Sequence, residues 1–238
     1  MLYLIGLGLN SKDMSLNALE VIKKCKKLYL ESYTGFGFTV KEIEKIIKRK
    51  IIVVERELIE NNSDNILKEA KKHDVGILVY GDPLFATTHI NYLIDAKKGN
   101  IKFKIIHSTS ILTAIGETGL SLYNFGKTTS IPFNNKNIIT PVNVIKDNLK
   151  LGLHTLLLLD LYPRNNKFLT INEALNYLLK HNISLNLITC CALGNSKQEI
   201  KYGNIRDLIK LKFNRYPQCL IIPGKLHFIE EEALKLLK

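Results

Sequence analysis

Short apolar runs alternate with longer segments of helical spacing over residues 1–110. The runs are rich in aliphatic and β-branched residues and have the length of buried strands. They predict strands at residues 2–9, 27–31, 51–54, 75–80 and 101–106. The intervening segments carry apolar residues every three or four positions and predict helices at residues 15–25, 40–50, 63–73, 86–96 and 111–118. Strand and helix repeated in this order indicate a parallel sheet with helices on its faces.

The second half of the chain has the same kinds of segment in a less regular order. We expect strands at residues 155–160, 185–191, 198–203 and 219–224, and helices at residues 142–151, 170–180, 205–211 and 229–237. Residues 120–141 predict a polar loop, in which Asn134–Asn137 is the boundary candidate on composition. The predicted fold class is α/β, with a mostly parallel N-terminal domain over residues 1–110 and a mixed C-terminal domain over residues 111–238.

Two polar turns and one glycine-rich segment lie at the ends of predicted strands of the first domain. Gly81-Asp82-Pro83 offers a flexible glycine, a carboxylate and a fixed φ angle, Ser108-Thr109-Ser110 offers hydroxyls, and Gly6-Leu7-Gly8 ends the first strand. Ligands of open α/β sheets bind at such carboxyl ends. Each turn also has a structural interpretation, as a turn sequence, a helix cap or a tight bend, and the dinucleotide fingerprint lacks its third glycine because position 11 is Ser.

The amino-acid composition disfavours several classes of function for this protein. The net charge is +12, but Lys greatly outnumbers Arg, so the excess indicates a lysine-rich surface more than a nucleic-acid site, while an acidic protein partner is allowed. The four cysteines have no metal-ligand spacing and are expected as small apolar residues in a reducing compartment. No apolar run reaches the roughly 18 residues of a membrane span, so we expect a cytoplasmic protein.

The histidines give no recognisable catalytic motif. His89 and His107 lie next to polar turns, whereas the others are expected at the surface or at strand ends: His73, His154, His181 and His227. His227 and Glu230 have helical spacing but lack further ligands, so no metal site is expected.

The loops at residues 6–9, 81–88 and 108–111, with a contribution from Leu159 and Asp160, would form an apolar cleft with few polar groups. Such a cleft suits a nucleoside-bearing cofactor. If the cofactor is a methyl donor, the protein has to align the reacting atoms and exclude water, which requires no conspicuous catalytic side chain.

Motifs from the first residue almost to the last together resemble a known family. They are Met1 to Leu9, Glu31-x-Tyr33-Thr34, Gly81 to His89, Gly116-x-Thr118-Gly119-Leu120, Phe125-Gly126-Lys127, Gly152 to Leu157 and Ile222 to His227. They look like the diphthine synthases of archaea, within the tetrapyrrole-methylase-like group of S-adenosylmethionine-dependent enzymes. Gly81-Asp82-Pro83 alone would indicate the wider group, whereas its extension to Ala86-Thr87-Thr88-His89 and the run Pro223-Gly224-Lys225-Leu226-His227 are more specific.

The resemblance implies two α/β domains with S-adenosyl-L-methionine in the cleft between them, and a homodimer. It implies methylation, three times in the archaeal form, of the amino group of 3-amino-3-carboxypropyl-histidine on translation elongation factor 2, a step of diphthamide biosynthesis. Matching positions give as cofactor contacts Leu9, Asp82, Phe85, Ser110, Ile111, Leu159 and Leu193, with Gln218 at the edge. It assigns no metal, and it does not settle which group deprotonates the acceptor amine.

The chain departs from the family pattern at several positions. Cys191 and Asn195 stand where Arg and Ser are usual, Gln218 stands where His is favoured, and residues 138–143 lack the usual Trp and Tyr pair. Two other functions remain as alternatives. One is a methyltransferase of the same group acting on a small tetrapyrrole, and the other is a non-catalytic basic module that binds RNA.

Overall fold

The computed structural model describes residues 1–54 and 63–237. It divides into two compact units, the N-terminal unit Met1–Ile111 and the C-terminal unit Leu112–Lys238. Each unit has its own sheet and core, which confirms the α/β class. The boundary suggested by composition at Asn134–Asn137 is wrong, because this stretch lies inside the C-terminal unit as the loop before α7 (Thr140–Lys150).

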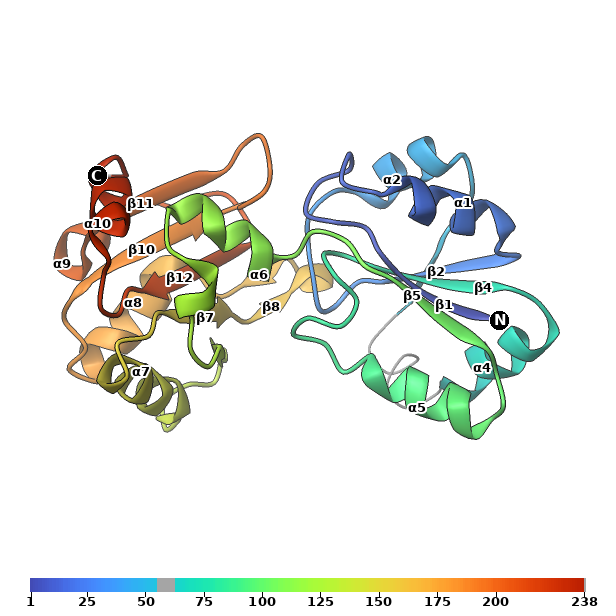
Figure 1. Cartoon of the computed structure of the whole chain (residues 1–238), viewed down its shortest axis with the longest axis horizontal. Helices are drawn as coiled ribbons and strands as arrows, with labels where there is room; N and C mark the ends of the chain where they lie inside the picture. The colour runs from blue at the N-terminus through green and yellow to red at the C-terminus, as the bar shows by residue number, and fades with distance from the viewer. Residues whose placement is uncertain (55–62, 238) are drawn as a thin grey trace. The chain divides into compact units, whose positions relative to one another are not determined.

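The N-terminal unit contains a five-stranded parallel sheet of order β3-β2-β4-β1-β5. Its strands are β1 (Leu2–Gly6), β2 (Lys27–Glu31), β3 (Ile52–Val54), β4 (Val75–Val79) and β5 (Phe103–Ile106). Leu2 of β1 pairs with Val75 of β4 on one side and with Phe103 of β5 on the other. Because these strands are parallel, the carboxyl ends of β4, β1 and β5 lie next to one another on one side of the sheet, which we call its carboxyl edge (Figure 1).

Helices cover both faces of this sheet. They are α1 (Leu16–Lys24), α2 (Val40–Ile47), α4 (Ser63–Lys72) and α5 (Ile90–Lys98), with α1 and α2 over one face and α4 and α5 over the other (Figure 1). Successive residues of β1 supply the two cores, because Leu4 packs with the α4 and α5 side and Ile5 with the α1 and α2 side. This double burial explains why the strands are apolar throughout rather than alternating.

The first turns of α1 and α2 are capped by side chains. The Ser15 hydroxyl accepts a hydrogen bond from the N–H of Ala18, and Thr39 and Glu42 form a capping box. The helix predicted from Ala86 instead begins at Ile90. Ala86 has a φ of 54°, in the left-handed region, so it cannot continue a right-handed helix and residues 82–89 form a loop.

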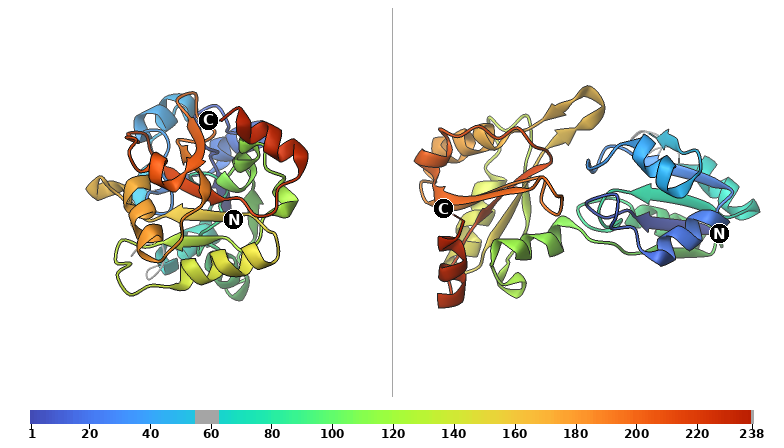
Figure 2. Two further views of the ribbon diagram at one scale, coloured as in Figure 1. Left: turned by 90° about the vertical axis from the view of Figure 1, so that its left-hand side faces the viewer. Right: turned by 90° about the horizontal axis from the view of Figure 1, so that it is seen from above.

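The C-terminal unit contains a mixed sheet of order β11-β10-β12-β7-β6, in which only the β6–β7 pair among the described strands is parallel. Its strands are β6 (Thr129–Ile131), β7 (Thr155–Leu159), β10 (Asn186–Cys191), β11 (Glu199–Asn204) and β12 (Gln218–Ile222). A small hairpin of β8 (Leu161–Tyr162) and β9 (Lys167–Phe168) projects from this sheet (Figure 2). The prediction of a loop over residues 120–141 missed β6.

Helices and 3-10 turns complete the C-terminal unit, and the first of them begins at Ile111, the last residue of the N-terminal unit. They are α6 (Ile111–Ala114), η1 (Ile115–Thr118), η2 (Leu122–Asn124), α7, η3 (Pro163–Asn165), α8 (Ile171–Lys180), α9 (Ile205–Leu208) and α10 (Phe228–Lys235). α7, α8 and α9 contribute to one core cluster with the sheet, around Leu157 and Leu220. Cys25, Cys190, Cys191 and Cys219 are buried and without disulfides. Among the described residues, no helix has both the length and the apolar character of a membrane span.

Candidate active site

The loops after β1 and β4 are joined at the carboxyl edge of the N-terminal sheet. The N–H of Gly81 donates to the carbonyl of Gly8 over 2.9 Å, and the N–H of Gly8 donates back over 3.2 Å. Both glycines have positive φ, at 80° for Gly8 and 73° for Gly81. A Cβ atom on Gly6 would lie 2.7 Å from the carbonyl oxygen of Gly81. The glycine pattern at the start of the chain therefore brings two strand ends into close contact.

Asp82 joins the loops after β4 and β5. Its Oδ1 accepts from the N–H of Leu84 at 3.0 Å, and its Oδ2 accepts from the N–H of Ser108 at 3.3 Å. Nδ1 of His107 lies 2.7 Å from the same Oδ2. The Asp82 side chain is 15% exposed. Because a carboxylate has about four acceptor positions, Asp82 retains capacity for one further donor.

Asp13 organises the loop after β1 and was missed by the sequence reasoning. Its Oδ2 accepts from the N–H groups of Leu9 at 3.0 Å and Asn10 at 3.2 Å. Its backbone carbonyl accepts from the hydroxyl of Ser108 at 3.3 Å. Short polar residues three apart, Asn10 and Asp13, are typical of side-chain-supported turns, and this was the signal available in the sequence.

A buried carboxylate and histidine lie behind the Asp82 loop. Glu31 ends β2 and accepts from the N–H of Tyr33 and from the N–H of Thr34 at 2.6 Å. Nε2 of His89 lies 3.9 Å from Oε2 of Glu31, and its Nδ1 donates to the carbonyl of Pro83 at 3.1 Å. Both side chains are fully buried. The motifs around Glu31 and His89 therefore support the loop rather than line its open side.

The predicted cofactor residues of the N-terminal unit come together at this edge. Leu9 follows β1, Asp82 and Phe85 follow β4, and Ser110 and Ile111 follow β5. The three strands are neighbours, and Gly81 is close enough to Ser110 that an added Cβ would lie 3.9 Å from its Cα. These residues therefore lie in the loops that follow three neighbouring strands, while their contact with a cofactor stays a prediction.

The other predicted residues lie at one edge of the C-terminal sheet. Leu159 ends β7 and Gln218 begins β12, where Cys219 pairs with Leu158, and Leu193 follows β10, where Cys191 pairs with Gln218. Asn195 continues the turn after β10, with its N–H donating to the carbonyl of Ala192.

The Gln218 side chain is already committed to the fold. Its Oε1 accepts from the N–H of Ile171 at 2.7 Å, and its Nε2 donates to the carbonyls of Phe213 and Arg215, each at 3.0 Å. Both of its N–H donors are thus used, and the amide holds the first turn of α8 against β12.

A second carboxylate centre, at Glu230 in α10, is sealed. Oε1 of Glu230 accepts from the N–H of Ser121 at 2.8 Å and lies 3.2 Å from Nε2 of His154, and Oε2 accepts from the N–H of His227 at 2.8 Å. Glu230 is 1% exposed. Burial by itself raises the pKa of this carboxyl, but hydrogen bonds from His227, Ser121 and His154 outweigh it and lower the pKa to about 2.

His154 directly precedes β7, as expected of a strand-end histidine, and its ring is fully buried. Its Nδ1 accepts from the N–H of Gly224 at 2.9 Å, so its proton is on Nε2, which donates to Glu230. A Cβ on Gly224 would lie 2.4 Å from the carbonyl oxygen of Gly152. The motifs at residues 152–157 and 222–227 therefore pack closely against each other, and their role is structural.

The residues at the N-terminal edge fit a methyl donor with an amino-acid part. Asp82 supplies a partly exposed carboxylate for an ammonium group, and Leu9, Phe85 and Ile111 supply partly buried apolar surface. In the described part of the chain, no three His, Cys, Asp or Glu side chains gather as they would around a metal ion.

Comparison with known proteins identifies the family. The family model of the tetrapyrrole (corrin/porphyrin) methylases matches residues 1–209. The diphthine synthase of Methanocaldococcus jannaschii is 45% identical over 253 aligned positions, and that of Methanococcus maripaludis strain C6 is 43% identical over 251, each covering 100% of this chain and 98% of the relative. A crystal structure of diphthine synthase superposes with a TM-score of 0.94 at 34% identity, covering 99% of this chain and 95% of that one. The chain belongs to the tetrapyrrole methylase family and, within it, to the diphthine synthases, and it is a methyltransferase.

Proposed function

We propose that this protein transfers methyl groups from S-adenosyl-L-methionine to the amino group of 3-amino-3-carboxypropyl-histidine on translation elongation factor 2, adding three, as a cytoplasmic step of diphthamide biosynthesis. The observation that carries the proposal is full-length similarity to diphthine synthases, at 43–45% identity. We also propose that the two compact units are the two domains of the enzyme.

The residues of the N-terminal edge have distinct proposed roles. The carboxylate of Asp82 would hold the cofactor's ammonium group, since an ionised acceptor and a cationic donor form a strong hydrogen bond. Ser110 would supply a polar contact, and the apolar side chains of Leu9, Phe85 and Ile111 would exclude water. The bound cofactor supplies an activated methyl group, so the protein contributes mainly alignment. Leu159, Leu193 and Gln218 are proposed as further contacts on the resemblance alone.

The test is methylation of the proposed acceptor. The protein is incubated with isotope-labelled S-adenosylmethionine and elongation factor 2 that carries the unmethylated histidine derivative, and the product is weighed by mass spectrometry. We expect the mass of three added methyl groups on that histidine. Incorporation of label into an added small tetrapyrrole, with none into the factor, would contradict the proposal and support the alternative that the family description suggests.

Cofactor binding is tested separately by titration calorimetry. Asp82→Ala should weaken binding of S-adenosylmethionine by about tenfold to a hundredfold, because a charge-assisted hydrogen bond contributes roughly 1.5–3 kcal/mol. Asp95→Ala is the matched control, since Asp95 lies in α5 and forms an exposed pair with Lys98 at 3.9 Å. Equal affinity in both variants would remove Asp82 from the proposed site. Steeply salt-dependent RNA binding without cofactor binding would favour the RNA-binding alternative.

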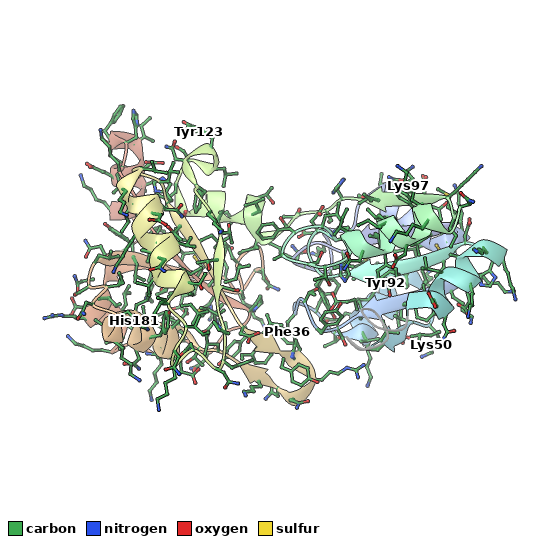
Figure 3. All side chains as sticks on the ribbon, turned by 90° about the horizontal axis from the view of Figure 1, so that it is seen from below. Phe36, Lys50, Tyr92, Lys97, Tyr123 and His181 are labelled. Atoms are coloured by element: carbon green, nitrogen blue, oxygen red, sulfur yellow. The ribbon has the colours of Figure 1, made fainter. Side chains whose placement is uncertain are left out.

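We propose that the protein is a homodimer, as the resemblance implies. Apolar side chains are exposed at η2 and α10, where Tyr123 is 87% exposed and points outward (Figure 3), and where Phe228 and Ile229 are also exposed. Exposed apolar groups of this kind favour association. Light scattering after size-exclusion chromatography should give twice the mass of one chain, and the mass of a single chain would contradict the proposal.

A further inference from the structure

A histidine at the carboxyl edge of the N-terminal sheet presents a nitrogen with no assigned role. His107 follows β5, and Oδ2 of Asp82 lies 2.7 Å from its Nδ1. A carboxylate oxygen only accepts, so the ring proton is on Nδ1 and the neutral ring has an unprotonated Nε2. The side chain is 67% exposed, and within residues 1–54 and 63–237 no hydrogen bond to Nε2 occurs. Nε2 is therefore available to a substrate.

Asp82 also fixes the ring mechanically. The same Oδ2 accepts from the N–H of Ser108, the residue after His107. One carboxylate oxygen therefore binds both the ring and the adjacent backbone, which holds the ring in one orientation. A histidine held in one tautomer by a carboxylate, with its other nitrogen open, has the arrangement of a general base. Among the described residues, Asp82 is the charged side chain that contacts His107, and Asp13 presents only a backbone carbonyl to Ser108.

The proposed reaction requires such a group. An alkyl amine is largely protonated at neutral pH, and only the unprotonated amine can attack a methyl carbon. The hydroxyls of Ser108 and Ser110 do not accept protons readily at this pH, whereas an imidazole does. The other edge histidine, His89, is fully buried and donates from its Nδ1 to Pro83.

We infer that His107 is the catalytic base that removes the proton from the acceptor amine, an inference that rests on the proposed function. Nε2 takes one proton from the ammonium group, and Asp82 balances the charge of the resulting imidazolium. The amine lone pair then bonds to the methyl carbon as that carbon's bond to the donor sulfur breaks, and the electron pair stays with the sulfur. The imidazolium returns its proton to water before the next transfer.

The test separates base catalysis from cofactor binding. His107→Asn keeps an N–H donor near the position of Nδ1 for Asp82 but has no counterpart of Nε2. His181→Asn is the matched control, because His181 follows α8 in the C-terminal unit (Figure 3), where its ring contacts Tyr177, and it is not among the proposed site residues. Each protein is assayed with the modified elongation factor 2 between pH 6 and pH 10, and its affinity for S-adenosylmethionine is measured by calorimetry.

We expect His107→Asn to lower the methyl-transfer rate at pH 7 by about a hundredfold, the usual contribution of a general base, with unchanged cofactor affinity. The deficit should shrink toward pH 10, where the amine loses its proton unaided. His181→Asn should match the wild type. A deficit that is the same at every pH, or a loss of cofactor affinity as large as the loss of rate, would overturn the inference while leaving the proposed function in place.

A readout independent of activity examines the ring itself. Long-range nitrogen–proton NMR on protein labelled in histidine should show the neutral form of His107 with its proton on Nδ1, and His107→Asn identifies the signal by its loss. A proton on Nε2 would overturn the inference whatever the rates. If the wild type binds cofactor but methylates no elongation factor 2, the proposed function fails, and the inference fails with it.

Discussion

Asp82 and Glu230 are two versions of one arrangement, a carboxylate that accepts from two backbone N–H groups and contacts one histidine ring. Each holds segments together that lie far apart in the sequence. They differ in burial, because Asp82 keeps 15% of its side chain exposed whereas Glu230 keeps 2%. They also differ in the second nitrogen of the histidine, which accepts from Gly224 in the sealed centre and has no hydrogen bond among the described residues in the open one, where the side chain is 67% exposed.

The difference shows that the kinds of side chain in a cluster do not by themselves identify a ligand-binding site. Both centres lie in motifs that resemble the same family, and both combine acid, imidazole and main chain. In the sealed centre both ring nitrogens of His154 form hydrogen bonds within the fold and the carboxylate is buried, so the contribution of this centre is to stability. In the open centre one acceptor position of Asp82 and Nε2 of His107 are left over, so a ligand can bind there.

The largest expected effect separates the two centres by stability. Glu230→Ala should destabilise the C-terminal unit by about 3–5 kcal/mol, because it leaves buried donors without an acceptor. Asp82→Ala should cost about 1 kcal/mol in the N-terminal unit, since water can reach the freed groups. Hydrogen exchange of β12 and β4 amides, read by mass spectrometry, measures both.

The control for this comparison is Glu231→Ala, the exposed neighbour in the same helix, which should change stability by less than about 0.5 kcal/mol. Equal costs for Glu230→Ala and Glu231→Ala would show that the buried network does not stabilise the unit.

A smaller effect concerns how the stability of the C-terminal unit changes at acidic pH. The pKa of Glu230 is lowered to about 2 in the folded protein, against about 4.3 when unfolded, so its ionised form stabilises the fold by roughly 3 kcal/mol above pH 4.3. This contribution is lost as the pH falls from 4.3 through 2. Hydrogen exchange of β12 should therefore accelerate over this range in the wild type, and Glu230→Gln should be less stable near pH 6 and respond less to acid. Parallel pH responses would contradict the role of Glu230.

The smallest effect concerns strain beside the two sheet edges. Ala86 has a φ of 54° next to Phe85, and Ala192 has a φ of 47° next to Leu193. Because glycine adopts this region without a penalty, Ala86→Gly and Ala192→Gly should each stabilise their unit by about 0.5–1 kcal/mol. Urea unfolding followed by circular dichroism measures the change. Destabilisation in both variants would indicate that the alanine methyl groups contribute packing that exceeds the strain.

The sequence predicted the N-terminal sheet well, because its strands are buried on both faces and therefore are continuous apolar runs, as β2 shows by matching its predicted bounds of Lys27–Glu31. It missed β6 and the β8–β9 hairpin, whose strands of two or three residues are too short to show a period. The polar turns at Asp82 and Ser108 were found, since turn chemistry is local. The long-range pairs, Asp13 with Ser108, Glu31 with His89 and His107 with Asp82, depend on strand order, which no local pattern encodes.

The carbonyl of Pro83 accepts from the hydroxyl of Thr87 at 2.7 Å and from the ring of His89 at 3.1 Å. The loop that carries Asp82 is thus ordered when the chain folds. Fixing the backbone of one residue costs roughly 1–2 kcal/mol of conformational entropy. A flexible loop that becomes ordered on binding would therefore make the free energy of ligand binding less favourable by this amount for each residue that is ordered. Here a ligand that reaches Asp82 meets a preorganised loop, and its affinity is not reduced by the entropy of ordering one.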